Sequence, residues 1–181
     1  MKELSTKDMY YRKAKPISYS IKERDKAKDV KYIVIHYTAG EKDAAKNNVD
    51  YFAPGNIAYA GAHFFVDQEG KIGRSIPMNH SANAVGGKRL SLLGGTLYGK
   101  VTNENSVSIE LCSLLKKEPS DEMVEAVKDL IKYIQKYCPK ATTIVRHYDV
   151  TSKSCPASMV DYEKWENFLT RIGYTLVGKK V

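Results

Sequence analysis

The chain of 181 residues contains no long run of apolar residues. Charged and polar residues follow Met1, so the sequence has neither the apolar core of a secretory signal peptide nor a stretch long enough for a transmembrane helix. We therefore expect a protein that is made in the cytoplasm and does not insert into a membrane. If its substrate lies outside the membrane, permeabilisation of the membrane or another secretion route must carry it there.

Cysteine is also scarce, with Cys112, Cys138 and Cys155 as the three thiols of the chain. An odd number of cysteines is a poor basis for a disulfide framework, so reduced thiols or a metal ligand fit better. The length is sufficient for one domain with a sizeable core and makes two ordinary domains improbable.

Blocks of five or more like charges are missing, although the formal net charge is +8. This excess of positive charge predicts attraction to anionic polymers, either nucleic acid or the phosphate-rich and carboxylate-rich wall of a bacterium. The densest basic stretch, residues 22–31, has acidic residues mixed into it, which argues against a dedicated arm for nucleic acid. We expect anionic wall polymers as partners and no nucleic acid, and a nucleic-acid-binding domain stays an alternative that rests on the charge alone.

The apolar residues predict strands that alternate with helices. Strands are expected over residues 31–37, 62–67, 71–76, 106–112 and 142–146. Helices are expected over residues 42–52, from Ser120 to Pro139, and after a capping box of Ser158 and Asp161. This order is typical of an α/β domain.

Two segments fall outside this pattern. Residues 1–30 are polar and rich in lysine, and we expect an N-terminal extension that is packed on the domain of residues 31–181 or partly disordered. Residues 86–104 contain five glycines and predict a long loop. Long loops in compact domains are often functional.

One carboxylate lies in an apolar strand. Within residues 106–112, Val107, Ile109 and Leu111 share one face, so Glu110 shares the other face with Ser108 and Cys112. A carboxylate in the middle of such a strand is costly unless it is paired or functional. The alternative is a glutamate on a solvated face of the strand.

Histidines provide a candidate metal site. His36 and His147 come directly after predicted strands, and Cys155 follows His147 by eight positions. Two imidazoles and one thiolate form a three-ligand site, in which a catalytic zinc keeps its fourth position for water. The spacing alone is a weak signal, because a histidine after a strand is usually a surface residue or one with satisfied hydrogen bonds. We expect His80 to lie on the surface.

Four stretches of the chain together form a recognisable pattern: YIVIHYTAG at 32–40, GAHFFVDQEG at 61–70, NENSVSIEL at 103–111, and IVRHYD at 144–149 together with KSCP at 153–156. With these stretches the chain resembles the zinc-dependent N-acetylmuramoyl-L-alanine amidase family, which includes phage endolysins, bacterial autolysins and animal peptidoglycan recognition proteins. The stretches occur in the family's order between residues 31 and 172.

The resemblance implies a central mixed β-sheet flanked by helices, with zinc held by His36, His147 and Cys155 at one end of a groove. It implies hydrolysis of the amide bond between N-acetylmuramic acid and L-alanine in bacterial peptidoglycan. Glu110 would then shuttle the proton and Lys153 would stabilise the oxyanion of the transition state. The alternatives are a glutamate on a solvated face and a lysine that faces solvent.

One further histidine and two cysteines are expected to have other roles. His63 matches a family position for which we expect a contact with substrate or with the zinc ligands, and the alternative is simple packing. Cys112 and Cys138 match no family position, so we expect inert packing residues.

Two departures from the family pattern concern the substrate groove. Many relatives have a tyrosine at the position of Ala62, and an aromatic residue with histidine where Asn83 and Ala84 stand. The first departure favours the branch that uses a glutamate in the role given to Glu110. The main alternative function is a binding module that recognises peptidoglycan without cutting it. Such modules lack the metal-binding cysteine, so the presence of Cys155 favours an enzyme.

Overall fold

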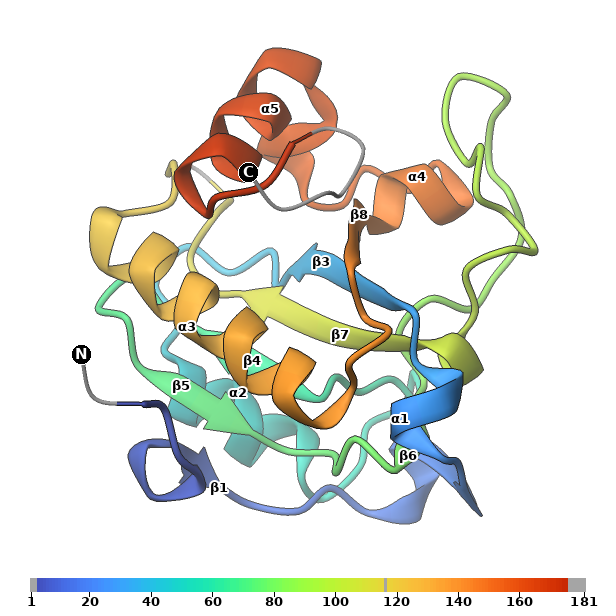
Figure 1. Ribbon diagram of the computed structural model, residues 1–181, viewed down its shortest axis with the longest axis vertical. Helices are drawn as coiled ribbons and strands as arrows, with labels where there is room; N and C mark the ends of the chain where they lie inside the picture. Colours follow the sequence, from blue (N-terminus) through green and yellow to red (C-terminus); the bar gives the residue numbers. More distant parts are fainter. Residues whose placement is uncertain (1–2, 116, 176–181) are drawn as a thin grey trace.

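The computed structural model describes residues 3–115 and 117–175, which form a six-stranded sheet flanked by helices (Figure 1). The strand order is β1-β5-β4-β7-β3-β8. Four neighbouring strands run parallel: β4 (Phe64–Val66), β7 (Ser106–Leu111), β3 (Tyr32–Tyr37) and β8 (Thr143–Arg146). On one edge, β5 (Ile72–Arg74) is antiparallel to β4 and pairs with the short β1 (Tyr10–Tyr11). The predicted mixed sheet and the hairpin of β4 and β5 are confirmed.

Helices cover both faces of the sheet. In Figure 1, α3 (Asp121–Tyr137) crosses in front of the sheet and α2 (Ala45–Phe52) lies behind it. The C-terminal helix α5 (Tyr162–Arg171) packs into the same core as α3. Two short helices, α1 (Lys26–Asp29) and α4 (His147–Thr151), lie next to the ends of β3 and β8. No helix among the described residues has both the length and the apolar character needed to cross a bilayer.

The main core lies between the sheet and α3. On β7, Val107, Ile109 and Leu111 are completely buried and face the apolar stripe of α3, as the alternation of the strand predicts. Ser120 begins α3 by accepting a hydrogen bond from the backbone N–H of Met123 at 3.1 Å, and the helix ends before Pro139. Because this face of the sheet carries the core, the opposite face is free to carry polar residues.

Residues 3–30 lie against this domain. Their strand β2 (Tyr19–Glu23) pairs with β6 (His80–Ala82) in a second, two-stranded sheet. Met9, Ala14 and Tyr19 are buried. This segment therefore contributes to the walls around β6.

The prediction was wrong at the start of two helices. The capping residue of α5 is Asp161, whose carboxylate accepts from the N–H of Lys164, and Ser158 lies in a 3-10 turn (Ala157–Val160). The helix expected over residues 42–52 begins at Ala45, whose N–H is bound by the carboxylate of Asp67 at 3.0 Å. In both cases a carboxylate binds the free N–H groups of the first turn.

Candidate metal centre and groove

The centre is built where three parallel strands end. His36 is the penultimate residue of β3, and Glu110 pairs with it on the neighbouring strand β7. Side chains at paired positions of adjacent strands point to the same face, so His36 and Glu110 both project to the face opposite α3. His147 directly follows β8, the other neighbour of β3. The two histidines therefore start from adjacent strand ends.

A short connection brings Cys155 back to the histidines. The N–H of Tyr148 donates to the carbonyl oxygen of Cys155 at 2.9 Å, and the N–H of Tyr37 donates to its sulfur. The buried Arg146, which precedes this connection, binds the carboxylate of Asp149 at 2.7 Å. It also binds the carbonyl oxygen of Met159, which follows the cysteine, at 2.7 Å. These contacts fix both ends of the segment that carries the thiol.

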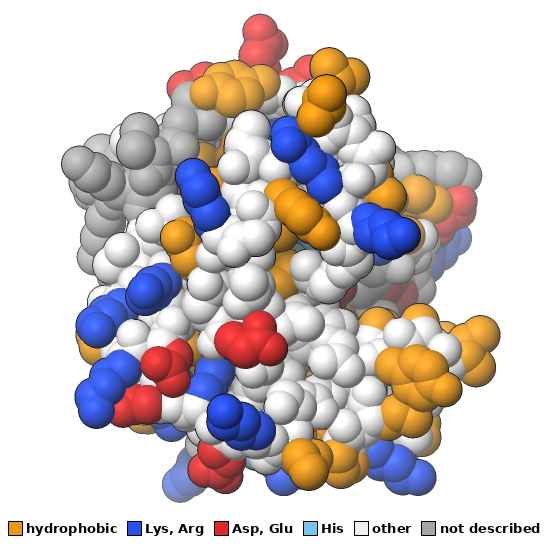
Figure 2. Space-filling view, turned by 90° about the vertical axis from the view of Figure 1, so that its right-hand side faces the viewer, with side chains coloured by type: hydrophobic (Ala, Val, Ile, Leu, Met, Phe, Trp, Pro, Cys, Tyr) orange, Lys and Arg blue, Asp and Glu red, His pale blue; other side chains and the backbone are white. Residues whose placement is uncertain are grey.

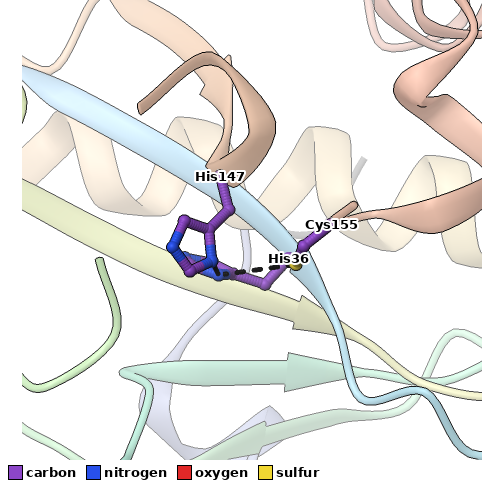
Figure 3. Close-up of side chains that lie close together, drawn as sticks. All are labelled: His36, His147 and Cys155. Carbon is purple, nitrogen blue, oxygen red and sulfur yellow. Dashed lines mark hydrogen bonds between the residues drawn. The ribbon is translucent and has the colours of Figure 1, made fainter. Parts of the chain in front are cut away.

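His36, His147 and Cys155 point toward one another (Figure 3). The two Nδ1 atoms lie 3.1 Å apart, and the sulfur of Cys155 lies 3.9 Å from Nδ1 of His36. All three possible ligand atoms are within 4.8 Å of one another, and all three residues are buried. This cluster could hold one metal ion.

Burial sets the charges of the three groups in the absence of a cation. Burial lowers the pKa of His36 well below its usual value and lowers the pKa of His147 to about 4, so both imidazoles are neutral. Burial also raises the pKa of the Cys155 thiol to about 12. A neutral imidazole is the form that binds metals, and a cation at the thiol favours the thiolate, so the site fits a positive ion.

Glu110 is a half-buried residue beside this cluster. Its Oε2 atom is inaccessible and has no hydrogen-bond partner among the described residues. Desolvation raises its pKa to about 7, against the opposing effect of the positive charge of Lys153. A carboxyl group with a pKa near neutrality can both accept and return a proton.

A groove opens beside the cluster, with a cavity volume of about 410 Å³. His147, Thr151 and Lys153 line one side of it, and Tyr59 and Lys88 are among the other lining residues. Figure 2 shows the face that corresponds to the right-hand side of Figure 1, with hydrophobic side chains on both sides of a central hollow. The groove thus gives a bound molecule access to the buried cluster of His36, His147 and Cys155.

The predicted site residues do not all meet in this groove. His63 is 1% exposed; its Nδ1 accepts from the N–H of Ser108 at 3.0 Å, and its Nε2 lies 3.0 Å from the carbonyl oxygen of His80. Burial lowers its pKa to about 3, so His63 is neutral with the proton on Nε2. Both ring nitrogens therefore have partners within the protein, an arrangement that fits the alternative of packing better than the expected contact with substrate or with the zinc ligands.

Other histidine and cysteine expectations have mixed outcomes. The expectation that His80 lies on the surface is wrong: its ring is buried against Tyr19, with the centroids 4.9 Å apart. Cys112 and Cys138 are completely buried, as expected of packing residues. Burial raises the pKa of both thiols, which disfavours reactive thiolates.

Two features of the site have no strong signal in the sequence. The carboxylate of Asp43 accepts from the hydroxyl of Thr38 at 2.5 Å, from the amide of Asn48 at 2.6 Å and from the N–H of Ser113 at 2.5 Å. Thr38 follows β3 and Ser113 follows β7, so Asp43 fastens together the ends of the strands that carry His36 and Glu110. Tyr59 lines the groove with a φ of 54°, a left-handed conformation in a loop that no sequence pattern indicates.

Comparison with known proteins decides the family. The family model for N-acetylmuramoyl-L-alanine amidases matches residues 26–158. The chain belongs to this family. The N-acetylmuramoyl-L-alanine amidase BlyA of Bacillus subtilis (strain 168) is 34% identical over 167 residues, which are 86% of this chain and 44% of BlyA. The chain thus spans less than half the length of the curated relatives it matches.

Solved structures of the amidase fold are similar throughout the domain. The structure of PlyL has a TM-score of 0.68 at 21% identity, with 91% of this chain and 96% of that chain covered. The catalytic domain of XlyA has a TM-score of 0.69 at 19% identity, with 91% and 99% covered. At this level of identity the likeness establishes the shared fold.

Proposed function

We propose that this amidase-family chain hydrolyses the amide bond between N-acetylmuramic acid and L-alanine in bacterial peptidoglycan. The observation that supports this most is the convergence of His36, His147 and Cys155 beside Glu110, on a groove of a chain that belongs to the amidase family. We further propose that the chain acts at the cell wall as an endolysin or autolysin-type domain, and that its positive charge favours anionic wall polymers.

Zinc is the metal that we propose for the cluster. A zinc–nitrogen bond is ~2.0–2.1 Å long and a zinc–sulfur bond is ~2.3 Å long. At tetrahedral angles, these bond lengths place the ligand atoms about 3.3 to 3.6 Å apart. The two Nδ1 atoms are 3.1 Å apart, the sulfur lies 3.9 Å from Nδ1 of His36, and all three possible ligand atoms lie within 4.8 Å of one another, which is close to this arrangement. Two imidazoles and one thiolate leave the fourth position open. When bound there, zinc supplies Lewis-acid chemistry and lowers the pKa of water.

Glu110 carries the proton in this proposal. Its carboxylate accepts a proton from the attacking water and returns it to the nitrogen of L-alanine as that amine leaves. Two observations support this role: the paired position beside His36, and the pKa of about 7 that burial gives the carboxyl group. A carboxyl with an ordinary pKa would return the proton to the amine less readily.

Lys153 stabilises the negative charge of the transition state. It lines the groove next to His147, and its charge acts on Glu110 and on both histidines. An ammonium group fixed beside the scissile carbonyl favours the oxyanion that forms when water attacks.

The identity of the broken bond tests this proposal. Mass spectrometry of digested peptidoglycan should find free stem peptides that begin with L-alanine, and glycan strands whose lactyl groups end in carboxylates. The alternative of a non-catalytic binding module predicts that the chain sediments with peptidoglycan and releases neither product. New reducing sugar ends without stem peptides that begin with L-alanine would contradict the amidase proposal.

Cys155→Ala provides the matched comparison for this assay. It removes a proposed metal ligand, whereas Cys138→Ala removes an equally buried thiol outside the cluster. We expect the first variant to lose both bound zinc and product release, and the second to keep both.

A further inference from the structure

The groove beside the metal cluster has an unbalanced charge. Lys88 and Lys153 line it, and none of its described lining residues is an aspartate or a glutamate. The other lining residues are neutral, such as Tyr59, Asn83 and Leu90. A concave surface with charges of one sign attracts a ligand group of the opposite sign. The groove therefore favours a bound molecule that has an anionic group.

The two lysines come from segments that are fastened together. The N–H of Leu90 donates to the carbonyl oxygen of Thr151 at 2.8 Å. Lys88 is two residues from one end of this hydrogen bond, and Lys153 is two residues from the other. The loop is held to α4 at further points, including the N–H of Gly95 to the carbonyl oxygen of Tyr148 at 3.0 Å. The position of Lys88 relative to the reacting centre is thus set by backbone contacts.

Lys88 is available to a ligand. Its residue is exposed, and none of the ion pairs among the described residues involves it. Lys153 already has a proposed role at the scissile carbonyl. Lys88 is therefore left to bind a different part of the substrate.

The chemistry of the substrate identifies that part, provided that the proposed function holds. The carboxyl group of muramic acid is consumed in the amide bond, the sugar rings are neutral, and L-alanine has a methyl side chain. The first anionic group along the stem peptide is thus the α-carboxylate of the second residue, D-glutamate. An extended chain advances ~3.3–3.6 Å per residue, so this carboxylate lies about 7 Å from the scissile bond. A groove of about 410 Å³ has room for such a dipeptide.

We propose that Lys88 determines substrate specificity by binding the α-carboxylate of the second stem residue. The chain then prefers stem peptides with D-glutamate over those with D-isoglutamine, in which an amide replaces this carboxylate. Both groups of the pair are accessible to water, so the preference is modest, about threefold to fivefold in kcat/KM.

The test uses soluble, uncross-linked glycan strands whose stem peptides carry either D-glutamate or D-isoglutamine at the second position and are otherwise identical. The rate of release of amino-terminal L-alanine gives kcat/KM for the wild type, Lys88→Gln, Lys88→Arg and Lys100→Gln. Lys100 is an exposed lysine of the same loop outside the groove lining, so its variant controls for the change in net charge.

We expect Lys88→Gln to slow hydrolysis of the D-glutamate strands alone and so to abolish the preference. Lys88→Arg and Lys100→Gln should keep it, and added salt should reduce it in the wild type. Equal rates on both strands in the wild type, or the same preference in Lys88→Gln as in the wild type, would overturn the role of Lys88 and leave the proposed function intact. Hydrolysis of neither strand by the wild type would overturn both.

Discussion

His36 and Glu110 occupy directly paired positions on the neighbouring parallel strands β3 and β7. Adjacent strands are about 4.8 Å apart, so the register places a proposed proton carrier beside a proposed metal ligand without any loop between them. The opposite face of both strands is packed against α3. The relative position of the two groups is therefore set by the core of the domain.

The first prediction concerns Glu110→Gln, which keeps the shape of the side chain and removes its ability to accept a proton. We expect kcat to fall about 100-fold to 10,000-fold, the usual contribution of a general acid-base group. Zinc content should be unchanged, because Glu110 is not one of the three proposed ligands. Glu125→Gln, on the exposed side of α3, should retain the wild-type rate. A Glu110→Gln enzyme with bound zinc and a normal kcat would rule out the assigned proton carrier.

A second prediction follows from His63. Its folded-state pKa is about 3, below the usual 6.5, so the unfolded chain takes up a proton first as the pH falls. The stability that neutral His63 contributes is thus complete above pH 6.5 and is lost as the pH falls toward 3. Between pH 6.5 and pH 5 the loss is about 2 kcal/mol. We expect urea unfolding of the metal-free protein to show a smaller loss over this range in His63→Gln than in the wild type. Identical pH dependence in the two proteins would contradict the buried neutral imidazole.

The third prediction concerns the clamp at Asp43. One carboxylate oxygen of Asp43 accepts from Thr38 and Asn48, and the other accepts from Ser113. In Asp43→Asn, an NH2 group replaces one of these oxygens, so at least one buried donor faces another donor. We expect the free energy of unfolding to fall by about 2 kcal/mol and kcat to fall with zinc still bound. Thr38→Val, which removes a single hydrogen bond, should have a smaller effect on both. Unchanged unfolding and kcat in Asp43→Asn would show that the clamp does not hold the strand ends in place.

A fourth prediction tests the packing of the loop on α4. A Cβ atom on Gly94 would lie 2.7 Å from a ring carbon of Tyr148, so Gly94→Ala must displace the loop or the ring. Because Lys88 and Leu90 of this loop line the groove, we expect KM for glycan strands to rise severalfold, about the effect of misplacing a binding group. Adding Tyr148→Ala to Gly94→Ala makes room for the new methyl group and should restore part of the affinity. A normal KM in Gly94→Ala would contradict a fixed loop.

The parts of the site that follow regular structure were predictable from the sequence. Alternation along residues 106–111 indicates which face of β7 carries Glu110, and His36 follows from the apolar run of β3. The grouping of His147 and Cys155 with His36 was implied by the family resemblance, since a spacing of eight residues has many possible geometries. The structure brings the three together through the contacts of Tyr148 and Tyr37 with Cys155.

The walls of the groove were not predictable in the same way. Lys88 and Tyr59 lie in loops, where position depends on individual long-range hydrogen bonds such as that from Leu90 to Thr151. The burial of His63 and His80 depends on the N-terminal segment, because Arg24 and Tyr19 cover them. A polar, lysine-rich segment gives no sign in the sequence of which residues it will cover.

A zinc titration of the metal-free protein tests the central claim most directly. We expect release of stem peptides with amino-terminal L-alanine from peptidoglycan to rise with added zinc and to reach its maximum at one zinc per chain, and Cys155→Ala to remain inactive at the same zinc concentrations. Full activity of the wild type without metal, or equal activation of Cys155→Ala, would contradict a catalytic zinc held by His36, His147 and Cys155.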